Sequence, residues 1–286
     1  MEMSLGSATF GQSYGVANFG STMPQANVQE ILECAIKFGI KHMDTSPNYM
    51  GTEKLIGDYL PQETGLKIST KLSSDAFQNN NILMAKIHQT LLDTSQDRLW
   101  AVLIHNPEAF RNSEIEEIRN GVHFLLESGL VTQVGFSAYN EKDVLLAKDA
   151  IPELTVFQIS ENICDQTKYH SQALLDLSKA GNQFFVRSIF LQGLLLMDPL
   201  NLPPKVVAAR EVLESLATYS KLHSISLLDA CIGYAKSIPW ATHLIFGVNS
   251  VLQLQNILTA FNSEQDLDFE DAPRLDSFLI DPRNWS

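Results

Sequence analysis

The sequence has few cysteines and no pair of them spaced as a metal or redox motif. Cys34, Cys164 and Cys231 are the only cysteines among 286 residues, and none belongs to a Cys-x-x-Cys pair. This pattern argues against a disulfide framework, a zinc site and a dithiol redox centre, and an odd number of thiols favours a reducing compartment. We therefore expect three packed thiols in a cytoplasmic protein.

Basic residues and long apolar runs are also scarce. The chain has 20 Lys and Arg against 33 Asp and Glu, for a formal net charge of -13, whereas non-specific binding to nucleic acid or to an anionic membrane needs an excess of basic residues. Residues 1–12 lack the features of a signal peptide, and the strongest apolar run, residues 188–197, is too short to span a bilayer. We expect a soluble protein with neither partner.

Short apolar runs alternate along the chain with longer amphipathic ones. The short runs are rich in β-branched and aromatic residues and predict strands at residues 4–10, 41–46, 66–71, 99–105, 131–137, 154–160, 184–190 and 242–248. Apolar residues at helical spacing predict helices at residues 24–38, 52–59, 81–93, 114–126, 141–150, 169–180, 205–223 and 251–261, with an additional one at residues 225–237. Gly39 is expected to end the first helix.

Eight strand and helix units predict the fold. Parallel strands joined by right-handed crossovers close into a (β/α)₈ TIM barrel of roughly 250 residues, and a doubly wound open sheet is the second choice. No linker or low-complexity tract divides the chain, so residues 1–286 are expected to form a single domain with a tail at about 262–286. Trp285 in the tail either contacts a ligand or pins the terminus.

Four polar side chains follow consecutive predicted strands, at the end of the barrel where such folds carry their chemistry. Asp44 closes the second strand, Tyr49 lies in the next loop, Lys71 ends the third strand and His105 ends the fourth. A lysine ammonium close to a tyrosine stabilises the phenolate, and a carboxylate keeps that ammonium charged. Together with a histidine that holds a substrate oxygen, the set suits proton donation to a carbonyl.

These residues carry a family resemblance. The stretches "DTSPNY" with "GTEKLIG", "ISTK" and "LIHNP" occur in the order and at the strand ends typical of the aldo-keto reductase superfamily, which the chain resembles over nearly its whole length. The resemblance implies a (β/α)₈ fold and hydride transfer from a nicotinamide cofactor to an aldehyde or ketone, without a metal. It assigns Tyr49 as general acid, Asp44 and Lys71 as the groups that tune it, and His105 as the residue that orients the substrate.

The resemblance also implies cofactor contacts at the ends of the first, fifth and sixth strands. Thr9 would line the barrel mouth, and Ser137 would contact the carboxamide, with Ala138 where many relatives have asparagine. Gln158 matches a glutamine whose amide offers complementary donors and acceptors to the nicotinamide amide, although a core hydrogen bond is the simpler interpretation.

Two later segments complete the implied cofactor site. After the seventh strand the candidates are Arg187, Ser188, Phe190, Gln192 and Gly193, and after the eighth they are Gly247, Asn249, Ser250, Gln253 and Asn256. Arg187 stands where relatives often stack an aromatic ring on the nicotinamide, so it either faces that ring or points away and pairs with a carboxylate or phosphate. No Arg or Lys lies near Asn249 to bind a 2'-phosphate, which leaves NADP and NAD both open.

The stretches "FGQSYGVAN", "FQISENICDQ" and "RSIFLQGLLLM" are similar to a bacterial subgroup of the superfamily that is often associated with surface-sugar biosynthesis. The expected partner is therefore a small carbonyl compound, with a sugar derivative as one possibility. Three other functions remain open: a Schiff-base aldolase that uses Lys71, a regulatory protein that holds the cofactor but turns over slowly, and, less favoured, a metal-dependent hydrolase. The oligomeric state is left open.

Overall fold

The protein is a closed barrel of eight parallel strands. The computed structural model describes residues 1–18, 23–60, 64–105, 110, 115–264 and 267–285. Each strand pairs with its neighbours in chain order, and β1 pairs with β8 to close the barrel. The strands are β1 Glu2–Gly6, β2 His42–Asp44, β3 Lys67–Leu72, β4 Leu99–Ile104, β5 Val131–Ser137, β6 Val156–Ser160, β7 Gln183–Arg187 and β8 His243–Gly247. The predicted (β/α)₈ TIM barrel is therefore confirmed.

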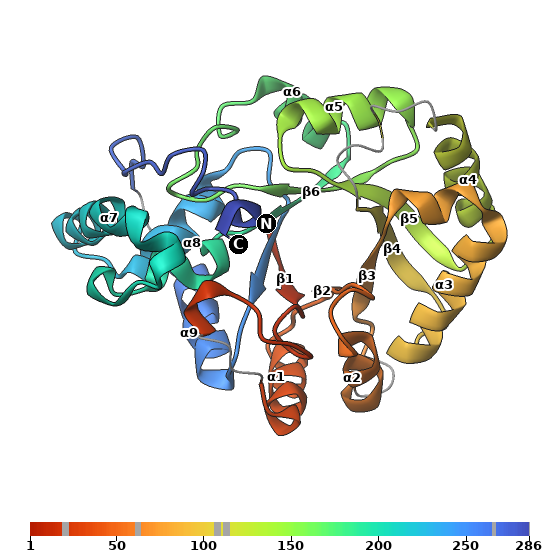
Figure 1. Cartoon of the computed structure of the whole chain (residues 1–286), viewed down its shortest axis with the longest axis horizontal. Coiled ribbons are helices and arrows are strands. Elements are labelled where there is room, and N and C mark those ends of the chain that lie inside the picture. Colours follow the sequence, from red (N-terminus) through yellow and green to blue (C-terminus); the bar gives the residue numbers. More distant parts are fainter. Residues whose placement is uncertain (19–22, 61–63, 106–109, 111–114, 265–266, 286) are drawn as a thin grey trace.

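Helices surround the strands, and both chain ends lie near the centre of the view in Figure 1. The α-helices are α1 Gln25–Lys37, α2 Thr52–Tyr59, α3 Asn80–Thr94, α4 Ile115–Glu127, α5 Glu141–Ala150, α6 Gln172–Lys179, α7 Arg210–Leu222, α8 Leu227–Ser237 and α9 Val251–Asn262. The additional helix before the last strand is thus confirmed as α8. Within the described part of the chain, no helix combines the length and apolar character needed to cross a membrane.

Local sequence signals explain where several helices begin and end. The side chains of Asn79, Asn140, Ser171 and Ser250 accept hydrogen bonds from backbone N–H groups in the first turns of α3, α5, α6 and α9, and such caps satisfy donors that have no partner within the helix. At the other end of α1, Gly39 has a φ of +78° and its N–H donates to the Ile36 carbonyl. A positive φ favours glycine, so Gly39 ends α1 as predicted.

Several predicted elements have different boundaries in the structure, and two of them differ most. The prediction of a strand over residues 4–10 is wrong at both ends, because β1 covers Glu2–Gly6 and a turn follows in which the Phe10 N–H donates to the Ser7 carbonyl. The segment predicted as one helix at 205–223 starts as a 3₁₀ helix, η6 Pro204–Ala209, before α7. Residue 114, the predicted start of α4, lies outside the described residues.

Two apolar clusters fill the molecule. The larger one joins helices to the strands they cover, and the smaller one comprises Trp100, Ala101, Leu103, Val156, Phe185 and Ile245 from four strands, as expected for the interior of a barrel. The three cysteines are buried and free. The last residues also pack inward: Trp285 is buried and its indole N–H donates to the Leu279 carbonyl at 3.2 Å, so Trp285 pins the terminus.

Candidate active site

Asp44 lies at the carboxyl end of β2 with hydrogen-bond partners on both carboxylate oxygens. Its Oδ2 is 2.6 Å from the Lys71 ammonium, and its Oδ1 accepts a hydrogen bond from the Gln158 side-chain amide. The register of the barrel places Asp44 beside Gly6 of β1 and Ser69 of β3. The side chains of Asp44, Lys71 and Gln158 are all buried, so the ion pair of Asp44 and Lys71 is shielded from water.

Lys71 connects the Asp44 carboxylate to the Tyr49 hydroxyl. Its Nζ donates to Asp44, to the Thr45 carbonyl at 3.1 Å and to the Tyr49 hydroxyl at 3.5 Å. Burial alone lowers the pKa of the Lys71 ammonium, but the attraction of Asp44 and Tyr49 outweighs burial, and the net pKa is raised. An ammonium that stays protonated argues against the neutral amine that a Schiff-base aldolase requires.

Tyr49 is held in the loop between β2 and α2. Its N–H donates to the Ser46 carbonyl at 3.0 Å, and its ring is half-buried. The loop leads into α2 through Gly51, whose φ is +76°. The loop after β1 packs against it so closely that a Cβ on Gly11 would lie 2.3 Å from the Met50 carbonyl oxygen. Only glycine fits at that contact, which fixes the approach of the two loops.

His105 follows β4 and is neutral at physiological pH. The backbone N–H of His105 donates to the Leu72 carbonyl at 2.8 Å, which anchors the residue beside the end of β3. Burial, together with the positive charges of Lys71 and Arg187, lowers the pKa of His105 to about 4. The neutral imidazole can hydrogen-bond to a carbonyl oxygen but holds no extra proton to donate. Residues 106 and 107, part of the predicted motif, lie outside the described residues.

The structure thus brings Asp44, Tyr49, Lys71 and His105 to one end of the barrel. Direct contacts join the first three, and the pKa of His105 responds to the charges of Lys71 and Asp44. The arrangement offers a phenol beside a fixed cation and a neutral imidazole near both. Such a set can donate a proton to an oxygen that gains negative charge.

Gln158 has an unused acceptor at this site. Because a carboxylate oxygen can only accept, the Gln158 amide nitrogen must face Asp44. Its Oε1 is buried without a hydrogen-bond partner in the described structure. Ser137 pairs with Gln158 in the β5–β6 register and is also buried. Gln158 therefore makes the core hydrogen bond of the simpler interpretation and still has a free acceptor for a ligand.

The segment after β7 has an unusual backbone. Ser188, Leu191 and Gln192 have φ values of 62°, 47° and 56°, and Gly193 has a φ of 88°. Leu191–Leu196 is assigned as the 3₁₀ helix η4, which contains this kink. Strained backbone of this kind concentrates at ligand sites. Phe190, the remaining candidate in this segment, is only 9% exposed and packs in the core.

Arg187 contacts protein groups that the sequence did not predict. Its guanidinium donates to the Ala138 carbonyl at 3.0 Å and to the Ser188 hydroxyl at 3.3 Å, and it lies 4.4 Å from the centre of the Tyr139 ring. The predicted alternative of an ion pair with a carboxylate is not found for Arg187 among the described residues. Its charge stays at the barrel mouth, close enough to lower the pKa of His105.

Some of the candidates around β8 make hydrogen bonds within the protein, and others are exposed. Asn249 exchanges hydrogen bonds with Asn18, and its N–H donates to the Gln253 side chain at 2.7 Å. Ser250 caps α9, while Asn256 and Gly247 are exposed. Thr9 is buried in the turn after β1, where its hydroxyl donates to the Val248 carbonyl at 2.9 Å. The prediction that Thr9 lies on a strand was wrong, although Thr9 does lie beside the end of β8.

Sequence reasoning missed three residues at the barrel mouth. The charges of Lys71 and Arg187 and the Tyr49 hydroxyl act on the Tyr14 hydroxyl, which places Tyr14 near the site. Arg283 lies 3.7 Å from the centre of the Tyr139 ring and pairs with Asp281, so the tail reaches the mouth. Tyr14 belongs to a quoted family stretch, but no local pattern could have indicated the contact between Tyr139 and Arg283.

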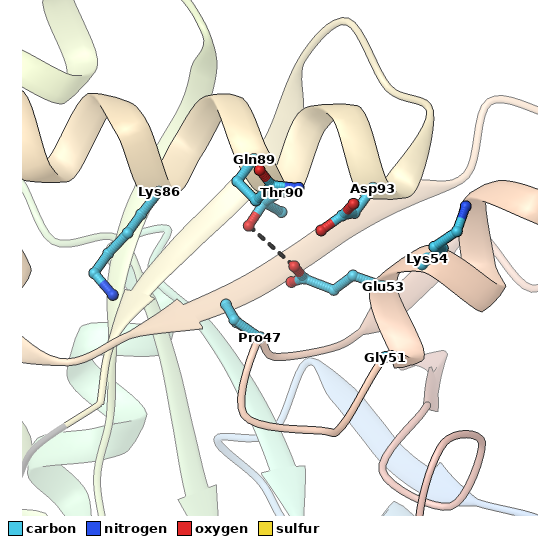
Figure 2. A pocket seen from close by; sticks show the side chains of 8 residues that line it. All are labelled: Pro47, Gly51, Glu53, Lys54, Lys86, Gln89, Thr90 and Asp93. Atoms are coloured by element: carbon cyan, nitrogen blue, oxygen red, sulfur yellow. Dashed lines mark hydrogen bonds between the residues drawn. The ribbon is translucent and has the colours of Figure 1, made fainter.

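A hollow lies outside the site, between α2 and α3 (Figure 2). It has a volume of about 240 Å³ and is lined by Pro47, Gly51, Glu53, Lys54, Lys86, Gln89, Thr90 and Asp93. Glu53 is buried and accepts hydrogen bonds from Thr70 of β3 at 2.6 Å and from Thr90 of α3 at 3.1 Å. Because Thr70 precedes Lys71, Glu53 ties both helices to the strand that carries the lysine.

Comparison with known proteins identifies the family. The sequence profile of the Aldo/keto reductase family matches residues 2–280. The chain belongs to this family. Two curated relatives are aldose reductase C of Dictyostelium discoideum, 28% identical over 62% of this chain and 67% of the relative, and an uncharacterized oxidoreductase of Schizosaccharomyces pombe, 27% identical over 40% of this chain and 41% of the relative.

Solved structures share the fold of this aldo/keto reductase. An aldo-keto reductase from Bacillus halodurans in its holo form superimposes with a TM-score of 0.73 at 15% identity, covering 93% of this chain and 88% of the other. A thermostable aldo-keto reductase crystallised with the inhibitor epalrestat gives 0.70 at 21% identity, covering 92% and 90%. The superfamily resemblance read from the sequence is confirmed. As a member, the chain is an oxidoreductase that acts on carbonyl substrates.

Proposed function

We propose that this aldo/keto reductase uses NADPH or NADH to reduce an aldehyde or ketone to an alcohol, with Tyr49 as the general acid. The observation that supports this most strongly is the Lys71 ammonium, which lies 2.6 Å from Asp44 and 3.5 Å from the Tyr49 hydroxyl at the carboxyl ends of the strands. A buried cation beside a phenol stabilises the phenolate that remains after proton donation.

The free acceptor on Gln158 supports binding of a nicotinamide. Its buried Oε1 has no partner in the described structure, and a carboxamide NH₂ is a donor that would satisfy it. Ser137 lies beside it, and the backbone from Arg187 to Gly193 together with the first turn of α9 would hold the remainder of a dinucleotide. When bound, the reduced cofactor supplies a hydride for the carbonyl carbon.

In this proposal each side chain has one task. The Tyr49 hydroxyl gives its proton to the carbonyl oxygen as negative charge develops there, and Lys71 stabilises the phenolate left behind. Asp44 keeps Lys71 charged and in place. His105, neutral because its pKa is lowered to about 4 by burial and by the nearby cations, donates a hydrogen bond that orients the carbonyl oxygen. The alcohol then leaves with one hydride and one proton added.

A sugar derivative is the proposed substrate class. This rests on the similarity to a bacterial subgroup associated with surface sugars and on the curated relative named aldose reductase C. Half-buried polar side chains at the mouth, including Tyr139 and Arg187, can hydrogen-bond to hydroxyl groups.

Turnover of a carbonyl panel tests the proposal. We expect the protein to oxidise NADPH or NADH in the presence of at least one aldehyde, including open-chain sugar aldehydes, at a rate of about 1–10³ s⁻¹ per site. Saturable cofactor binding without oxidation for any member of the panel would instead favour a regulatory role. Covalent trapping of substrate on the protein by borohydride, lost in Lys71→Met, would favour an aldolase.

A further inference from the structure

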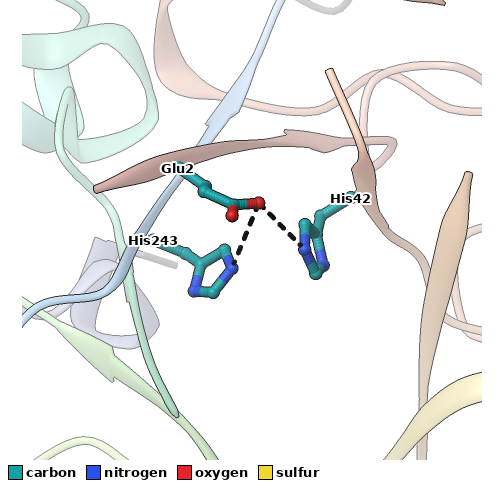
Figure 3. A group of neighbouring side chains, drawn as sticks. All are labelled: Glu2, His42 and His243. Atoms are coloured by element: carbon teal, nitrogen blue, oxygen red, sulfur yellow. Dashed lines mark ion pairs between the residues drawn. The ribbon is translucent and has the colours of Figure 1, made fainter. Parts of the chain in front are cut away.

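Three potential metal ligands meet at the amino end of the barrel, opposite the candidate active site. Glu2, His42 and His243 are the first residues of β1, β2 and β8. Because β1 lies between β8 and β2, the register pairs Glu2 with His243 and Ser4 with His42. In Figure 3 the Glu2 carboxylate lies between the two imidazole rings. Barrel closure therefore assembles this cluster from residues that are far apart in the sequence.

The spacing of the ligand atoms suits a small tetrahedral ion. Glu2 Oε2 is 3.3 Å from His42 Nε2 and 3.9 Å from His243 Nε2, and the three residues offer ligand atoms within 4.8 Å of one another. Ligands about 2.0–2.1 Å from a zinc ion are about 3.4 Å apart in a tetrahedron. A small movement of Glu2, whose side chain is 55% exposed, would bring all three to an ion.

The hydrogen bonds of His243 leave one lone pair unused. The Thr242 hydroxyl donates its single hydrogen to the Phe184 carbonyl at 3.0 Å and accepts from the Phe184 N–H at 2.8 Å. His243 Nδ1 lies 2.8 Å from the same hydroxyl, and Nδ1 carries the hydrogen in the tautomer that keeps the Thr242 hydroxyl bonded to the Phe184 carbonyl. Nε2 is then an acceptor, buried without a partner in the described structure, and it faces Glu2.

Packing holds both rings in place before any ion binds. The His243 ring stacks on Phe185 with 3.9 Å between ring centres, and the His42 ring meets the edge of Trp100 at 4.8 Å. The two histidine rings are themselves 4.5 Å apart. The second nitrogen of a metal-binding histidine is usually held by a hydrogen bond, and Thr242 supplies one at His243 Nδ1. His42 Nδ1 has no partner in the described structure, so ring packing alone orients His42.

We propose that Glu2, His42 and His243 bind a divalent transition-metal ion of the zinc class, with water completing the coordination on the exposed side of Glu2. Two imidazoles and one carboxylate form a donor set that zinc and its neighbours favour over calcium or magnesium. The Lys67 ammonium acts electrostatically on both histidines and weakens binding. The ion would join the starts of three strands where the barrel closes and would take no part in carbonyl chemistry.

Calorimetric titration of the full chain with Zn²⁺, after removal of metals with a chelator, tests the site. We expect one Zn²⁺ to bind the wild type. Glu2→Gln keeps the shape of an exposed side chain but removes its charge, and His243→Gln removes a ligand. Outer-shell partners alone contribute about 10- to 100-fold to metal affinity, so loss of either ligand should weaken binding by about 100-fold or more.

His123→Gln is the matched control. His123 also contacts a carboxylate, Glu153, at 3.0 Å, but it lies on the surface of α4, so its variant should bind Zn²⁺ like the wild type. Co²⁺ in place of Zn²⁺ should give the intense visible bands of four- or five-coordinate cobalt, absent in Glu2→Gln. A wild type that binds no Zn²⁺, or Glu2→Gln that binds as the wild type does, would overturn the proposal, even if His243→Gln fails to fold.

Discussion

Asp44 and Lys71 form a buried ion pair, and further hydrogen bonds hold each member. The Asp44 carboxylate is satisfied by Lys71 and Gln158, and Lys71 Nζ is satisfied by Asp44, Thr45 and Tyr49. Removing one member of such a pair leaves a buried charge without compensation, which costs more than the pair itself contributes. The pair should therefore matter for folding as well as for the Tyr49 proton.

Lys71→Met should lower the free energy of unfolding by about 3–5 kcal/mol, because it leaves the Asp44 carboxylate buried and unpaired. The double variant Asp44→Asn with Lys71→Met removes that charge and should recover part of the loss. Urea unfolding followed by circular dichroism measures both. If the double variant is less stable than Lys71→Met, the unpaired charge is not the cause.

His105 should not titrate across the pH range in which the enzyme works. Its folded pKa of about 4 lies below the ordinary value of 6.5 because of burial, Lys71 and Arg187, so the ring becomes cationic only as the pH falls towards 4. We expect kcat/KM for carbonyl reduction to show no ionisation of His105 between about pH 5.5 and 8. A step near pH 6.5 in the wild type that vanishes in His105→Gln would contradict this assignment.

At the scale of secondary-structure elements, the sequence predicted the ends of β2, β3 and β4 better than the end of β1. Asp44 and Lys71 lie at the carboxyl ends of β2 and β3, and His105 directly follows β4, so barrel geometry alone brings their positions together. The error at Thr9 arose because β-prone residues continue past Gly6, whereas the chain turns at Ser7. A run of strand-forming residues does not show where pairing with neighbouring strands stops.

Glu53 holds three secondary-structure elements together through hydrogen bonds that no sequence pattern indicated. It links α2 to β3 through Thr70 and to α3 through Thr90, two hydroxyls that lie 17 and 37 residues away along the chain. Contacts over such separations depend on how the helices pack. For the same reason, the sequence did not indicate the stacking of Arg283 on Tyr139 or the meeting of Glu2, His42 and His243.

Glu53→Leu should lower the free energy of unfolding by about 2–4 kcal/mol, because it leaves two buried threonine hydroxyls without an acceptor. Glu53→Gln should cost less, since the amide can accept from one hydroxyl and donate to the other. Chemical denaturation of the two variants measures the difference. Equal losses in both would show that the volume of the side chain matters more than its hydrogen bonds.

At the scale of the whole molecule, the expected cofactor site draws on segments that are distant in the sequence. Gln158 and Ser137 lie on β6 and β5, Arg187 ends β7, and Ser250 caps α9. A ligand that spans them would tie the second half of the barrel together. Binding to the folded state alone raises the free energy of unfolding in proportion to the logarithm of ligand concentration.

NADP(H) or NAD(H) should therefore stabilise the whole barrel against unfolding, by about 2.7 kcal/mol at a concentration 100 times the dissociation constant. Thermal melts with each of the four cofactor forms measure this and rank NADP against NAD. The mononucleotides serve as controls, because they span only part of the site and should stabilise less. An unchanged melting temperature with all four dinucleotides would contradict the proposed cofactor site.

The most direct test of the central claim is the rate of carbonyl reduction by Tyr49→Phe, measured together with its dissociation constant for the reduced cofactor. Tyr49→Phe keeps the ring but removes the hydroxyl that lies 3.5 Å from Lys71 Nζ. If Tyr49 is the acid, the rate should fall by about 10²–10⁴-fold while the dissociation constant stays at its wild-type value. A variant that reduces a good aldehyde substrate at the wild-type rate would contradict the assignment.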